Sequence, residues 1–134
     1  MASRKKKTWV YSPPRKSKPK VPENLKQELY EKGNKIVEEI FKPEYLEPVP
    51  ENLTLNHLVD IYTKWYRNSF YFCSEYKCPP EAISSSFESK FARMEYLGDN
   101  KFELSYMRHT GKWWPLQTGS MEECLKNIST MLPY

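Results

Sequence analysis

The chain has 134 residues, a length that suits one domain, and 39% of them are hydrophobic and 15% aromatic. No apolar run follows its basic start and no stretch of 18 apolar residues occurs, so we expect no secretion signal, no association with a membrane and a cytoplasmic location. Three cysteines cannot all pair, which favours free thiols that serve as small core residues: Cys73, Cys78 and Cys124.

The N-terminal segment differs from the rest of the chain in charge. Residues 1–20 contain eight lysines and arginines and no acid, whereas the remaining residues include 13 basic and 17 acidic ones. Several prolines and few apolar residues predict that 1–21 is a disordered basic tail, ahead of a single domain at 22–134. Such a tail either binds phosphates with little sequence preference or only keeps the protein soluble. Its candidate phosphate-binding residues are Arg4, Lys5, Lys6, Lys7, Arg15 and Lys16.

The first predicted element is a helix over 22–42. Pro22 suits a first helical position, and apolar residues from Leu25 to Phe41 recur at helical spacing. Pro43 is expected to end this helix, because proline lacks the N–H that the next turn needs. Further prolines make 43–56 an extended connection.

From residue 57 the hydrophobic period changes to two, which predicts β-strands. Turn signals follow the first and third of them, so neighbouring strands are expected to run antiparallel. In the third strand, alternation places Phe91 on the same face as Arg93, opposite Ala92 and Met94. Pro115 indicates that the last strand lies at an edge. The expected strands are 57–66, 70–75, 87–96, 102–107 and a short 113–116.

A final helix is predicted at about 120–131. Ser120 and Glu123 form a capping box, in which a hydroxyl and a carboxylate accept hydrogen bonds from backbone donors. The order of elements predicts an α+β fold: an antiparallel four- to five-stranded meander sheet with the N-terminal and C-terminal helices on one face.

Three segments carry a resemblance to a known family. They are 63–73 (TKWYRNSFYFC), 91–96 (FARMEY) and 104–114 (LSYMRHTGKWW). They resemble a family of small uncharacterised bacterial proteins, and the similarity spans roughly 22–130. The resemblance implies a bacterial cytoplasmic setting and nothing about chemistry.

Aromatic residues are dense in the first two strands, where Tyr62 and Tyr66 are candidates for an exposed sheet face. Exposed rings on a sheet can stack on unpaired bases of RNA or DNA. The alternative is structural, because alternation sends about half of the rings into the core whatever the function.

A second candidate site is the turn between the last two strands. Its cations and hydroxyl can hold a phosphate or a carboxylate, and its two adjacent tryptophans are expected on opposite faces. The alternative is a solvated hairpin anchored by a tryptophan. The candidate residues are Arg108, His109, Lys112, Trp113 and Trp114, with Arg93 joining from a neighbouring strand.

Catalytic patterns are weak in this sequence. Glu88, Lys90 and Asp60 loosely match a magnesium nuclease arrangement, and His109 with a cysteine makes a nominal nucleophile pair. We therefore predict no cofactor and a protein that is non-enzymatic and associated with nucleic acid, RNA being favoured over DNA. The alternatives are a protein–protein interaction or structural module, and a small-anion-binding or nuclease-like enzyme.

Overall fold

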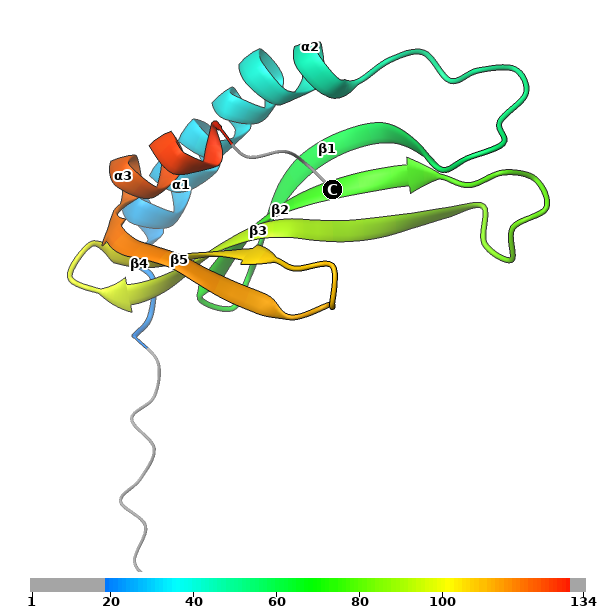
Figure 1. Ribbon diagram of the computed structural model, residues 1–134. Helices are drawn as coiled ribbons and strands as arrows, with labels where there is room; N and C mark the ends of the chain where they lie inside the picture. The colour runs from blue at the N-terminus through cyan, green and yellow to red at the C-terminus, as the bar shows by residue number, and fades with distance from the viewer. Residues whose placement is uncertain (1–18, 131–134) are drawn as a thin grey trace, which may run out of the picture.

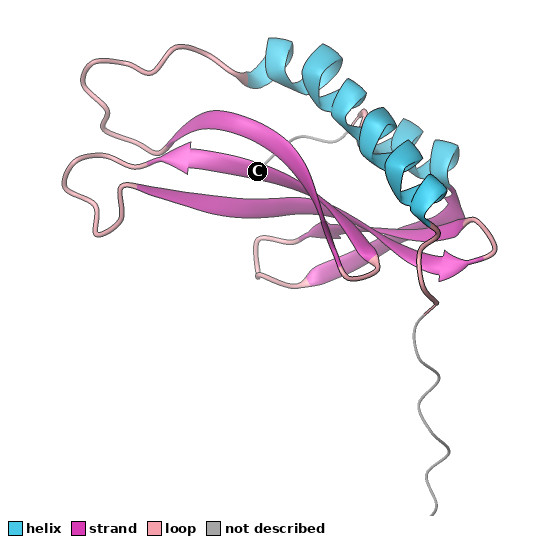
Figure 2. Ribbon diagram, turned by 180° about the vertical axis from the view of Figure 1, so that it is seen from behind, coloured by secondary structure: helices cyan, strands magenta, loops and turns pink. Residues whose placement is uncertain are grey.

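A five-stranded sheet and a helical layer on one of its faces make up the fold, which a computed structural model describes over residues 19–130 (Figure 1). Both helical segments lie on the same side of the sheet, as predicted (Figure 2). The tail candidates lie outside the described residues, so their role stays a prediction. Val21, at the end of the segment that we assigned to the tail, is buried in the core.

The N-terminal helical segment runs past the proline that was expected to end it. It comprises α1 (Glu23–Ile36), the π-helical turn η2 (Val37–Phe41) and α2 (Lys42–Tyr45). Proline inside a helix removes one backbone donor and crowds the preceding turn. Here the wider turn η2 ends two residues before Pro43, with the Lys42 N–H bonded to the Val37 carbonyl. The prediction of an end at 42 is therefore wrong by three residues.

The sheet is the antiparallel meander that the sequence predicts, with its strands in chain order. Its last strand continues to Ser120, four residues beyond the predicted end. Pro115 is tolerated because this strand lies at an edge, and a register irregularity next to it lets pairing resume at Gln117. The strands are β1 (His57–Tyr66), β2 (Ser69–Lys77), β3 (Ser86–Gly98), β4 (Lys101–Met107) and β5 (Trp113–Ser120).

The C-terminal helix α3 (Met121–Ile128) begins with the predicted capping box. The Ser120 hydroxyl accepts from the Glu123 N–H at 3.2 Å, and the Glu123 carboxylate accepts from the Ser120 N–H at 2.8 Å. The helix ends three residues before the predicted boundary. Side-chain hydroxyls there donate to helix carbonyls, Ser129 to Lys126 and Thr130 to Asn127.

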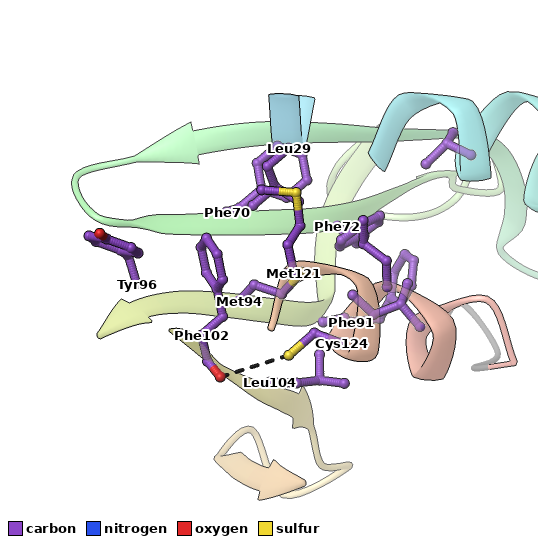
Figure 3. Packing of buried hydrophobic residues seen from close by; sticks show 14 of the residues in the cluster. Leu29, Phe70, Phe72, Phe91, Met94, Tyr96, Phe102, Leu104, Met121 and Cys124 are labelled. Carbon is purple, nitrogen blue, oxygen red and sulfur yellow. Dashed lines mark hydrogen bonds between the residues drawn. The ribbon is translucent and has the colours of Figure 1, made fainter. Parts of the chain in front are cut away.

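The core lies between the helices and the inner face of the sheet (Figure 3). Gly33 lets α1 approach closely, because a Cβ at this position would lie 2.6 Å from the ring of Phe70. Cys124 is buried, and its thiol contacts the Phe102 carbonyl at 3.8 Å. The three cysteines are free and buried, as expected. Fully buried rings dominate this core: Phe41, Phe70, Phe72, Phe91 and Phe102.

A bulge in β3 changes which side chains share a face. Phe72 of β2 lies opposite Ala92 and its neighbour Cys73 lies opposite Lys90, so Phe91 is an extra residue. Phe91 packs against Phe41 on the helix side, with ring centroids 5.8 Å apart. The prediction that Phe91 shares a face with Arg93 is therefore wrong, because strict alternation does not continue across a bulge.

Candidate functional site

The outer face of the sheet, away from the helices, carries a cross-strand row of polar and aromatic side chains. Tyr71 of β2 lies opposite Lys64 of β1 and opposite Arg93 of β3, and Arg93 lies opposite Ser105 of β4. Directly opposed residues project to the same face of a sheet. This outer row is therefore built from four strands whose opposite face carries buried core residues, among them Ile61, Phe72, Met94 and Leu104.

Two rings and a guanidinium meet in this row, and we call them the Arg93 cluster: Tyr71, Arg93 and Trp113. The Arg93 guanidinium lies 4.6 Å from the centroid of the Trp113 ring, and the Tyr71 and Trp113 centroids are 5.9 Å apart. A guanidinium over an indole is a favourable cation–π arrangement. The Nε atom of Arg93 is buried and has no hydrogen-bond partner among residues 19–130. The cluster thus holds a cation with an unused donor over the Trp113 ring, which Tyr71 also contacts.

A charged network borders the Arg93 cluster and centres on Glu88 of β3. Lys64 and Lys90 reach its carboxylate at 2.8 and 3.0 Å, and the Tyr62 hydroxyl also donates to it. Burial by itself raises the pKa of Glu88, but the hydrogen bonds from Lys64, Tyr62 and Lys90 outweigh it and hold the pKa at about 2. Glu88 therefore stays ionised and keeps both lysines beside the rings.

Two further groups near Glu88 have a raised pKa. Burial, and then the hydrogen bond to Glu88, raise the pKa of Tyr62, so its hydroxyl stays protonated. Burial also raises the pKa of the Cys73 thiol to about 11. Cys73 lies opposite Tyr62 and is fully buried, which makes it a protonated packing residue and not a nucleophile.

The bulge at Phe91 brings together two cations that alternation separates. Lys90 and Arg93 are three residues apart, a spacing that places side chains on opposite faces of a regular strand. Because the bulge adds one residue, Lys90 lies opposite Cys73 while Arg93 lies opposite Tyr71, both on the outer face. The Lys90 amine lies 5.9 Å from the Tyr71 ring centroid. Sequence reasoning named Arg93 but not Lys90 as a binding residue, since no local signal identified this bulge.

The turn between β4 and β5 is divided between the two faces. Trp113 is opposite Met107 and belongs to the Arg93 cluster, whereas Trp114 is opposite Tyr106 on the helix side. Trp114 is 50% exposed and pairs with Arg108, whose guanidinium lies 4.7 Å from its ring centroid. The expectation of opposite faces is confirmed, and it means that the predicted turn residues do not form one continuous surface.

The remaining predicted residues also differ in their surroundings. Tyr66 is 56% exposed, and Arg67 lies 5.1 Å from its ring centroid. Tyr66 borders a hollow of about 380 Å³ together with Lys64, Tyr71 and Lys90. His109 and Lys112 are exposed at the turn, and Arg108 donates its backbone N–H to the Lys112 carbonyl at 2.9 Å.

Comparisons with known proteins bear on the family and not on the chemistry. A family described as "Domain of unknown function (DUF3024)" matches residues 18–131. The chain belongs to the DUF3024 family. The match covers the whole region, roughly 22–130, for which the sequence suggested an uncharacterised family. No curated protein and no solved structure matches the chain.

The described part of the DUF3024 domain offers neither a metal site nor a membrane-spanning helix. Residues 19–130 contain no group of three His, Cys, Asp or Glu side chains placed to hold a metal ion. Glu88, the carboxylate of the nuclease-like pattern, is instead occupied by two lysines and a tyrosine. Over the same residues, none of the helices combines the length and apolar character needed to cross a bilayer.

Proposed function

We propose that this DUF3024 protein is a non-enzymatic RNA-associated protein that binds single strands on the outer face of its sheet. The observation that supports this best is the Arg93 cluster, in which a cation and two rings lie together on a face that none of the helices within residues 19–130 covers. Proteins that bind single strands commonly stack bases on sheet-borne aromatic rings and pair the backbone with nearby cations. Lys64 and Lys90 lie beside Tyr71 and supply such cations.

The net charge of the domain limits how strongly the domain can attract RNA. Beyond residue 20 the chain has more acidic than basic residues, and Glu88 already neutralises part of the charge on its two lysines. The domain alone therefore attracts a polyanion weakly. In our proposal the eight cations of residues 1–20 supply the long-range attraction, and the Arg93 cluster supplies short-range stacking.

The test is a titration of labelled oligouridylate with hydroxyl ends, at low and moderate salt, with thymidine and duplex oligomers as comparisons. We expect Trp113→Ala to weaken binding by about 5- to 150-fold, the loss of one stacked base. Trp114→Ala, the neighbouring ring on the other face, is the matched control and is expected to leave binding of this oligomer nearly unchanged. Deletion of residues 1–20 is expected to weaken binding and to flatten its salt dependence.

Two results would contradict the proposal. One is that the full-length protein binds no oligomer at low salt. The other is that Trp113→Ala and Trp114→Ala weaken binding equally, which would mean that the outer face has no special part in it. Circular dichroism of each variant confirms that the sheet is retained.

A further inference from the structure

A cavity lies where β4 separates from β3. β2 pairs with β3 from Ser86 onwards, whereas β4 pairs with β3 only from Ala92 onwards. Beyond that point β2 and β3 run on past the end of the β4–β5 hairpin (Figure 1). The space between the unpaired edge of β3 and the turn of this hairpin is a cavity of about 490 Å³, lined by Ser89, Lys90, Tyr106, Met107, Arg108, His109 and Gly111.

The lining of this cavity suits an anion. Lys90 brings a nitrogen donor to it from β3, and Arg108 and His109 bring donors from the turn between β4 and β5. No acidic residue is among the described residues that line it. The ring of Trp114 lies against the Arg108 guanidinium and limits its freedom to move. An arginine held in this way can offer two parallel N–H donors to the oxygens of a phosphate. The volume is in the range of small-ligand pockets.

Lys90 connects this cavity to the outer face. It lines the cavity, and it also lines the hollow that contains Lys64, Tyr66 and Tyr71. A strand that stacks on the Arg93 cluster therefore has a short path, past a cation, into the cavity. An internal phosphodiester carries one negative charge, whereas a terminal phosphate monoester carries about 1.5 to 2 and has three free oxygens.

We propose that this cavity binds the terminal phosphate of the RNA strand held on the outer face. This inference rests on the proposed function and adds an end preference to it. Arg108 is the principal phosphate ligand, Lys90 lies between the terminal phosphate and the stacked bases, and His109 adds a donor at the rim. The shared chemistry is a phosphate monoester at either the 5′ or the 3′ end.

The experiment compares three labelled oligouridylates of equal length: one with a 5′ phosphate, one with a 3′ phosphate, and one with hydroxyls at both ends. We expect one phosphorylated form to bind about tenfold more tightly than the hydroxyl form, which is the size of one charge-assisted contact. Arg108→Ala is expected to abolish this difference while leaving the affinity for the hydroxyl form unchanged. Lys112→Ala is the matched control, because Lys112 is exposed in the same turn but does not line the cavity.

The outcomes separate this inference from the proposed function. Equal affinity for all three oligomers would contradict the phosphate site, whereas the proposal that RNA binds on the outer face would be retained. If no oligomer binds, the proposed function fails, and uridine monophosphate then tests the cavity alone by NMR. Shifts at His109 and Gly111 that Arg108→Ala removes would retain a phosphate site, whereas unchanged spectra would overturn it.

Discussion

The two faces of the sheet are made by the same strands and yet differ in almost every physical respect. On β2, Phe70 and Phe72 point to the helices and are fully buried, while Tyr71 between them is only half-buried on the outer face. On the inner face buried Phe rings pack on one another, whereas on the outer face Tyr71 and Trp113 pack both on each other and on cations. The helices thus determine which half of an aromatic-rich strand forms the core and which half is left on the outer face.

The largest expected effect is a difference in stability between substitutions at two neighbouring residues of β2, one on each face. Phe72→Ala removes a fully buried ring and is expected to lower the free energy of unfolding by about 3–5 kcal/mol. Tyr71→Ala, on the outer face, is expected to cost about 1 kcal/mol but to weaken RNA binding. Denaturant unfolding of both variants measures the difference. Equal losses of stability would mean that the outer row is a second structural core and not a binding surface.

Gly33 tests how closely the helical layer covers the inner face. Alanine normally favours a helix over glycine, by about 0.5–1 kcal/mol. Here its Cβ would lie 2.6 Å from the ring of Phe70, which is fully buried and cannot move aside freely. We therefore expect Gly33→Ala to destabilise the protein by about 1–3 kcal/mol.

Thermal or denaturant unfolding measures this loss for Gly33→Ala. Gln27→Ala, at an exposed position of the same helix, is the control and is expected to change stability by less than about 0.5 kcal/mol. An increase in stability for Gly33→Ala would show that α1 has room to move away from the sheet.

The comparison of the two faces also shows what the sequence can and cannot predict. Strand periodicity, turn residues and the Ser120–Glu123 box are local signals, and the elements and the meander follow from them. The bulge at Phe91 is set by pairing with β2 and by packing against Phe41, so no local pattern showed it. For the same reason the helix continues through Pro43, where the π-helical turn and the core contacts outweigh the local signal.

The candidate site also combines features that the sequence predicts with features that depend on how the strands pair. That Trp113 and Trp114 lie on opposite faces follows from alternation, and the sequence predicted it. That Lys90 and Arg93 lie on one face follows from the bulge, and the sequence did not predict it. The cavity beside Arg108 depends on where β4 stops pairing with β3, which is a property of three strands together.

The smallest expected effect concerns the charged network on the outer face. Because the pKa of Glu88 is about 2 in the folded protein and about 4.3 in an unfolded chain, its charge stabilises the fold at neutral pH. This contribution is fully present above about pH 5 and is lost as the pH falls towards 2. Its size is limited to about 1 kcal/mol, since the partners are partly exposed to solvent.

Glu88→Gln is therefore expected to be less stable than the natural chain at pH 7, and the difference is expected to shrink as the pH falls and to vanish below about pH 2. Denaturant unfolding across this range measures it. Glu81→Gln, in the exposed loop between β2 and β3, is the control and is expected to show no such pH-dependent difference. A deficit for Glu88→Gln that stays constant with pH would mean that hydrogen-bond geometry, and not charge, keeps Lys64 and Lys90 beside Tyr71.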